Sequence, residues 1–120
     1  MQVSKFKSLG GLLLFIIILL WIGKVVWNRF MLDRNGIYTI GTTVGRDVTS
    51  KGVYIDYFFV FGNSEYSGSR QPENYNVMEE GGRYFVIFIK EDPDNNRILW
   101  DKPVPEHITE SPPEGWEEIP

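Results

Sequence analysis

The first third of the chain is dominated by one uninterrupted apolar run. Residues 9–27 read LGGLLLFIIILLWIGKVVW, and nineteen helical residues span about 28 Å, close to the hydrocarbon thickness of a bilayer. The twelve Leu, Ile, Val and Phe residues between Leu12 and Trp27 favour insertion by roughly 4–7 kcal/mol, more than the ~3 kcal/mol that Lys24 can cost near one end. We therefore predict a membrane anchor, with contact positions at Leu12, Phe15, Ile18, Trp21, Lys24 and Trp27.

Two other interpretations of this run are weaker. A cleaved secretory signal fits the basic start at Lys5 and Lys7, but no small-x-small cleavage pattern follows Ile22. A buried helix of a soluble protein does not need apolar residues on every side. The positive groups on the two flanks are balanced, three against three when the N-terminal amine is counted with Lys5 and Lys7. A short basic tail before the run is typical of a signal-anchor that exports the following domain. We expect a single-pass protein of the cell membrane with its soluble domain on the exported side.

The chain after the anchor divides into a short connection, a domain and a tail. Asn28 to Arg34 contains no helix breaker, so the helix is expected to continue to about Arg34 and to end at a left-handed stop formed by Asn35-Gly36. Such a connection is short and stiff and holds the domain close to the bilayer. The predicted units are residues 1–34 for the tail and anchor, 35–102 for a β domain, and 103–120 for a Pro/Glu-rich tail.

Residues 37–100 change to the alternating pattern of short strands separated by turns. The turns are predicted at Ser50–Gly52, at Gly62-Asn63 and at Glu91–Asn96, with Gly41 and Gly45 as possible bulge positions. The predicted strands are Ile37–Val48, Val53–Phe61, Ser64–Arg70, Arg83–Lys90 and Arg97–Trp100. The fold class is therefore α+β: a single N-terminal transmembrane helix followed by a small five-stranded antiparallel β-barrel or curled sheet.

Three segments leave alternatives open. Gln71–Gly82 fits either a two-turn helix that starts near Pro72 or a coil that crosses the barrel end. Val53–Phe61 and Tyr84–Ile89 are apolar on both faces, so the second face must be covered by residues 71–82, by the tail, by a partner chain or by the membrane surface. The tail carries five prolines and five glutamates and is either a loose strap with Trp116 against the barrel or a docking peptide for another protein.

Charge and composition exclude several functions. Residues 35–120 contain seven basic and fifteen acidic side chains, and a domain this acidic repels nucleic acid. The chain has no cysteine, and its single histidine, His107, lies in the tail. Asp92, Asp94 and Asn96 match the start of a calcium loop, but Arg97 and Pro103 stand where Gly and Glu are required. We expect no metal and no cofactor.

An acid–base pair is the remaining catalytic possibility. Asp56 and Glu65 are the candidate carboxylates. A structural role for Asp56, at a strand edge or paired with an arginine such as Arg83, is the more common outcome for such a residue. No catalytic residue is assigned, and we expect a non-enzymatic protein.

Three groups of residues follow one another in a characteristic order. They are a step at Gly41-Thr42-Thr43-Val44, an aromatic strand and turn at Tyr57–Gly62 followed by Tyr66-Ser67-Gly68, and a strand from Gly82 through Val86 into Asp92-Pro93-Asp94-Asn95-Asn96. This order resembles a family of small domains of unknown function in bacterial membrane-tethered proteins. It covers about residues 37–100 and implies a small β-barrel-like module beside a membrane. It implies no catalytic residues.

Taken together, the sequence predicts a domain that binds another protein near the bilayer. Tyr54, Tyr66 and Trp116 are the candidate residues of the interaction surface. The alternative is a small-molecule or lipid-binding barrel whose aromatic residues line a pocket. A cavity above about 300 Å³ inside the barrel would favour this alternative, whereas a filled barrel with an exposed apolar patch would favour protein binding.

Overall fold

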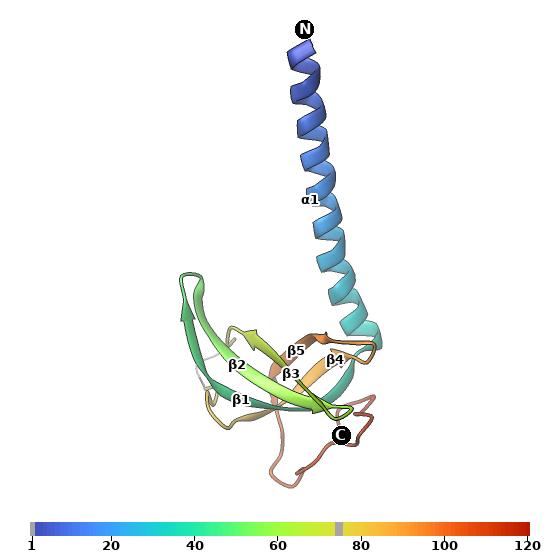
Figure 1. The fold of residues 1–120 in the computed structure, drawn as a ribbon. Coiled ribbons are helices and arrows are strands. Elements are labelled where there is room, and N and C mark those ends of the chain that lie inside the picture. Colours follow the sequence, from blue (N-terminus) through green and yellow to red (C-terminus); the bar gives the residue numbers. More distant parts are fainter. Residues whose placement is uncertain (1, 74–75) are drawn as a thin grey trace.

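The fold is one long helix followed by one curled antiparallel sheet (Figure 1). The computed structural model describes residues 2–73 and 76–120. The sheet has the strand order β3-β2-β1-β4-β5. The elements are α1 (Gln2–Asn35), β1 (Ile37–Thr49), β2 (Gly52–Phe61), β3 (Ser64–Arg70), β4 (Arg83–Ile89) and β5 (Asp92–Pro103). The predicted fold class, an N-terminal apolar helix followed by a five-stranded antiparallel curled sheet, is confirmed.

α1 projects away from the sheet and leaves its apolar side chains uncovered (Figure 1). Leu20 and Trp21 are 70% and 68% exposed, and none of the most apolar window within Gly10–Asn35 is buried. This exposure contradicts the core helix of a soluble protein. Among the described residues, α1 is the one helix that is long and apolar enough to cross a membrane, a property of length and composition that a signal sequence shares.

The helix ends at Asn35, one residue later than expected, and without a left-handed residue. The amide of Gly36 donates to the carbonyl of Leu32 at 3.1 Å, but neither Asn35 nor Gly36 has the positive φ that a left-handed stop requires. The prediction of a left-handed stop was wrong. Glycine is needed at position 36 because a Cβ there would overlap the side chain of Ile87 and the carbonyl of Leu32.

The β1–β2 and β2–β3 turns form at the predicted residues, whereas the β4–β5 turn is displaced along the chain. Gly62 and Asn63, with φ of 58° and 66°, form the two-residue β2–β3 turn, and the β1–β2 register shifts between Thr43 and Gly45, the bulge predicted at Gly45. The turn predicted at Glu91–Asn96 is instead Lys90-Glu91, because Ile89 pairs with Asp92. β5 therefore starts at Asp92, ahead of the predicted start at Arg97. Pro93, which has no N–H to donate, lies where the register of β5 is irregular.

The segment between β3 and β4 is not a helix in its described parts, 71–73 and 76–82. Its polar backbone groups bond to β1 and β4 instead of to each other. The hydroxyl of Thr43 donates to the carbonyl of Met78 and accepts from the amide of Gly82, at 2.9 and 2.8 Å, and the amide of Met78 donates to the hydroxyl of Tyr84. The helix prediction was wrong, and the alternative of a coil across the end of the sheet describes these residues.

The second face of β4 is covered from within the chain. Ile87 and Ile89 pack against Leu32 near the end of α1, and the ring of Phe85 meets that of Trp116 with centroids 5.8 Å apart. Trp116 also exchanges both backbone hydrogen bonds with Tyr38 at 2.8 and 2.9 Å. The helix end and the tail therefore supply the cover that the doubly apolar strand requires.

The tail is held as an extended strap. The guanidinium of Arg83 donates to the carbonyls of Ile108 and Pro105 at 2.5 and 3.3 Å. The hydroxyl of Thr39 donates to that of Ser111 at 2.9 Å. Together with Trp116, these contacts fix the tail at three places along the sheet, as the strap interpretation anticipates.

Candidate functional site

The inside of the curled sheet is filled by large side chains. Eight of them pack into one cluster, each at most 7% exposed and several in direct ring contact. They are Ile55, Tyr57, Phe59, Tyr84, Val86, Phe88, Ile98 and Trp100. The surfaces that can receive another molecule therefore lie on the outside of the sheet and along its edges.

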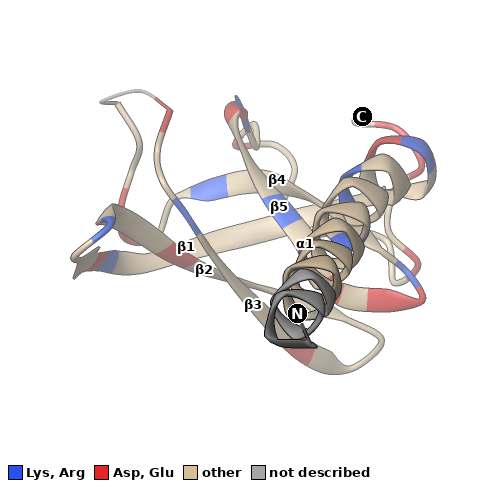
Figure 2. Cartoon of the chain, turned by 90° about the horizontal axis from the view of Figure 1, so that it is seen from above, with Lys and Arg blue, Asp and Glu red and all other residues tan. Residues whose placement is uncertain are grey.

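The first such surface is the seam between β3 and β5, the two edge strands of the sheet (Figures 1 and 2). Side chains bridge the seam in place of a strand ladder. Arg70 on β3 donates to the carbonyl of Ile98 on β5 at 2.6 Å. The hydroxyl of Tyr57 donates to Oδ1 of Asn96 at 2.6 Å, and the amide of Asn96 donates to the carbonyl of Ser67. The curled sheet closes here through polar side chains rather than backbone pairing.

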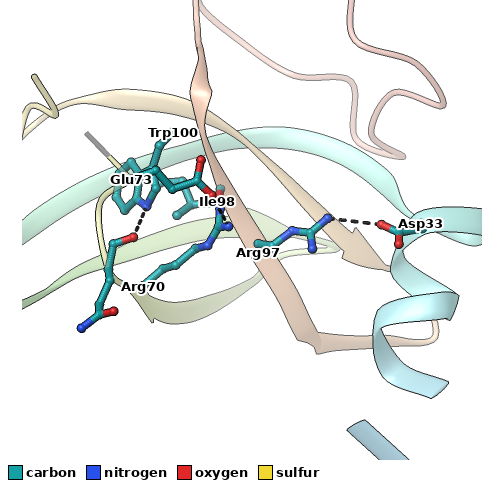
Figure 3. Close-up of polar contacts among 7 residues, drawn as sticks. Asp33, Arg70, Glu73, Arg97, Ile98 and Trp100 are labelled. Atoms are coloured by element: carbon teal, nitrogen blue, oxygen red, sulfur yellow. Dashed lines mark hydrogen bonds and ion pairs between the residues drawn. The ribbon is translucent and has the colours of Figure 1, made fainter. Parts of the chain in front are cut away.

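A hollow of about 600 Å³ opens at this seam beside the end of α1. Its lining contains three arginines from three different elements, Arg29 of α1, Arg70 of β3 and Arg97 of β5, against a single acidic residue, Asp33. Figure 3 shows Arg97 pointing to Asp33, at 3.3 Å, and Arg70 beside Glu73 and Ile98. We call this site the arginine hollow. It is a positive site on a domain whose loops and tail carry many acidic residues (Figure 2).

Tyr57 borders the arginine hollow as a neutral group. Its ring lies in the core, and the residue is only 2% exposed. Burial raises the pKa of Tyr57 to about 12, with smaller opposing effects from a hydrogen bond to the Ile98 backbone and from the charges of Arg70 and Arg97. The hydroxyl therefore keeps its proton at neutral pH and remains a donor to Asn96.

The second surface is an apolar patch on the outer face of β1 and β2. Val44 and Val60 are each 56% exposed, and Phe58, two residues before Val60 on the same face, is half-buried. Asp56 lies next to Phe58 in a hollow of about 680 Å³ that Glu65 also lines, and Glu65 pairs with Val60 across the strands. We call Val44, Phe58 and Val60 the outer patch; its rim is acidic.

The structure distributes the three predicted surface residues over different parts of the domain. Tyr54 is half-exposed and pairs with Asp47 near the β1–β2 turn. Tyr66 stacks on Phe59 with centroids 5.6 Å apart, and Trp116 packs on the sheet as described above. They do not form one surface. In contrast, the predicted anchor residues all lie along exposed α1: Leu12, Phe15, Ile18, Trp21, Lys24 and Trp27.

The candidate acid–base residues take ordinary structural positions. Asp56 is half-exposed on the outer face of β2, and Arg83, the partner suggested for it, bonds instead to the carbonyls of the tail. Asp92 and Asn96 of the rejected calcium loop both lie within β5. Within residues 2–73 and 76–120, no group of three or more His, Asp or Glu side chains is placed to hold a metal ion.

Sequence reasoning missed both surfaces. The arginine hollow brings together Arg29, Arg70 and Arg97, of which the first and last are 68 residues apart in the chain. No local pattern links them. The outer patch had a weak signal, since Val60 and Phe58 belong to the second apolar face of β2. For that face the sequence left open a cover by residues 71–82, by the tail, by a partner chain or by the membrane surface.

The resemblance to domains of bacterial membrane-tethered proteins stays a prediction. No protein-family model matches the chain, and no curated protein or solved structure is significantly similar to it. The segments that carry the resemblance lie in β1, at the end of β2, in β3, in β4 and at the start of β5.

Proposed function

We propose that this chain is a non-enzymatic, single-pass membrane protein whose β domain binds another protein close to the bilayer. The observation that carries the proposal is the outer patch, in which two exposed valines flank a half-buried phenylalanine on a domain with a filled interior. Exposed apolar residues that gather on one face favour a protein contact.

The way α1 meets the sheet supports binding at a defined height above the membrane. Leu32 is buried between Ile87 and Ile89, the side-chain amide of Asn95 donates to the carbonyl of Asn28 at 3.3 Å, and Arg97 pairs with Asp33. These contacts join the sheet to the last two turns of the helix, next to Trp27. The domain thus presents its outer face in a fixed orientation to the anchor.

The charge around the outer patch defines the partner's chemistry. Asp56 and Glu65 flank the patch, and the segment from residue 35 onward has an excess of eight negative charges. A complementary surface is apolar at its centre and carries Lys or Arg at its rim, since such complementarity speeds association and excludes acidic partners. The partner we propose is a protein with a basic rim around an apolar contact.

The side of the membrane is part of the proposal. The short basic start of the chain favours export of the domain. Because the chain has no cysteine, a Ser64→Cys variant carries a single thiol, in the exposed β2–β3 hairpin. An impermeant maleimide should label it in intact cells, and a Ser4→Cys variant should react only after lysis. The reverse pattern would place the domain inside.

The binding proposal is tested by purifying tagged full-length protein in gentle detergent and identifying co-purifying chains by mass spectrometry. We expect one partner at near-equal stoichiometry, lost in Val44→Lys and Val60→Lys. Val48→Lys is the matched control, because Val48 is 69% exposed but lies at the β1–β2 hairpin, away from the patch. A protein that purifies alone, or a partner retained equally by all three variants, contradicts the proposal.

A further inference from the structure

We infer that the arginine hollow binds the phosphate of an anionic phospholipid at the membrane surface. The site is separate from the outer patch and goes beyond the proposed binding of a protein. Its basis is the convergence of Arg29, Arg70 and Arg97 on one hollow of about 600 Å³ at the foot of α1.

Arg29 and Arg97 are the guanidiniums best placed to receive an anion, and Arg70 beside them is already engaged. Arg70 is held in place by the carbonyl of Ile98 and by Glu73, both at 2.6 Å. Arg97 has one ionic partner, Asp33, at 3.3 Å, and the Asp33 side chain is 65% exposed. An exposed pair of this kind is weak, so a phosphate oxygen can replace the carboxylate at Arg97. Arg29 is exposed on the helix side of the hollow.

The hydrogen-bonding groups at the hollow suit phosphate. Guanidinium groups present paired N–H donors that match two oxygens of one phosphate. Ser69 also lines the hollow and supplies a neutral hydroxyl donor. The side-chain amide of Asn96 donates to backbone carbonyls and serves to shape the wall. Asp33 is the single carboxylate in the lining, and Glu73 outside it pairs with Arg70. The three arginines therefore keep an excess of one positive charge over these two carboxylates.

The position along α1 identifies the source of the phosphate. Arg29 is two residues beyond Trp27, the end of the apolar run, which corresponds to about 3 Å along the helix axis. The polar layer of each leaflet extends roughly 5–8 Å beyond the hydrocarbon core. Arg29, on the membrane side of the hollow, is therefore at the depth of the lipid phosphates, and an arginine there contacts the layer in which anionic headgroups are concentrated.

The test uses the full-length protein in phosphatidylcholine nanodiscs that contain a minor fraction of phosphatidylglycerol. Native mass spectrometry measures which lipid stays bound after the protein is released from the nanodisc. In a second arm, nanodiscs of phosphatidylcholine alone receive inorganic phosphate, and the thermal midpoint of the β domain is recorded. The variants are Arg29→Gln and Arg97→Gln. Arg34→Gln is the matched control, because Arg34 is an exposed arginine of the same helix end, stacked over Phe30 and outside the hollow.

We expect the natural protein and Arg34→Gln to retain phosphatidylglycerol over phosphatidylcholine. Arg29→Gln should bind it about fivefold more weakly, the effect of about 1 kcal/mol for one arginine at an anionic surface. If Arg97→Gln fails to fold, Arg29→Gln decides the result, because Arg29 is exposed on α1.

Two results would overturn the inference. Equal retention of phosphatidylglycerol by all variants means that the lipid binds through the overall charge of the protein and not in the hollow. The second result combines two readouts. Inorganic phosphate raises the thermal midpoint of the natural protein but not that of Arg29→Gln, and neither protein prefers phosphatidylglycerol. This result would assign the hollow to free phosphate and overturn the lipid source. Neither result depends on the outer patch, so the proposed protein binding is tested separately.

Discussion

The junction between α1 and the sheet depends on Leu32, and replacing this residue should release the domain from the helix. Leu32 is 5% exposed and packs with Ile87 and Ile89. Leu32→Ala removes about three buried methylene equivalents at ~0.8 kcal/mol each. The small cluster borders the surface, so the cost should fall in the lower part of the usual range, roughly 2–3 kcal/mol.

The contacts that remain cannot replace this loss. The hydrogen bond from Asn95 to the Asn28 carbonyl contributes about 0.5–1.5 kcal/mol. The pair between Arg97 and Asp33 is partly exposed and contributes at most ~1 kcal/mol. The equilibrium between docked and undocked domain should therefore shift by roughly 30- to 150-fold toward the undocked form, with Gly36 as the pivot.

The assay is a distance distribution between spin labels at Val26→Cys on α1 and Ser64→Cys on the β2–β3 hairpin, both exposed positions. The unaltered junction should give a narrow distribution and Leu32→Ala a broad one. Leu20→Ala is the matched control, since Leu20 is 70% exposed on the same helix. Tryptophan fluorescence reports whether the core around Trp100 stays folded. A narrow distribution in Leu32→Ala, equal to that of the control, would refute the reasoning.

Two further predictions concern the seam and the tail. Because burial raises the pKa of Tyr57 to about 12, the neutral buried hydroxyl is fully compatible with the fold below pH 10. Stability of about 3 kcal/mol at most is lost as the pH rises from 10 to 12. Tyr57→Phe should lower the free energy of unfolding by about 1 kcal/mol at pH 8, because the hydrogen bond to Asn96 is lost. The variant should lose less stability than the natural protein between pH 8 and pH 11, measured by urea titration at both pH values. An equal loss in the two proteins would contradict this. Arg83→Gln should free the tail from its carbonyl contacts and speed its cleavage in limited proteolysis, whereas Arg46→Gln, which removes an exposed pair with Glu79, should leave cleavage unchanged.

Local patterns in the sequence were enough to predict the helix and most of the sheet. A run of apolar residues on every side predicts a long helix that avoids water, and α1 extends over that run without being covered by the rest of the chain. Gly62-Asn63 predicted the β2–β3 turn because both residues tolerate positive φ, which both adopt. These features depend on neighbours in the chain.

The misassigned elements depend on contacts from elsewhere. Pro72 and Gly81-Gly82 are the start and stop signals of a helix over residues 71–82. In the described part 76–82, Thr43 and Tyr84 instead bond to the backbone groups of Met78 and Gly82. The strand that starts at Asp92 reads locally as a turn, and its pairing with Ile89 overrides that signal. In both cases hydrogen bonds to a distant strand replaced the local preference, as tertiary contacts commonly do.

The sequence alone thus determined the long apolar helix, the five-stranded sheet and the acidic character of the domain, because each follows from composition or from short-range periodicity. The tertiary structure decided which apolar face stays exposed and where the charges meet. β4 is covered by Leu32 and Trp116, whereas Val44 and Val60 on β1 and β2 are left uncovered. The arginine hollow exists because the curl of the sheet brings β3 and β5 together beside the end of α1. Only the three-dimensional path of the chain specifies that meeting, since its residues share no sequence neighbourhood.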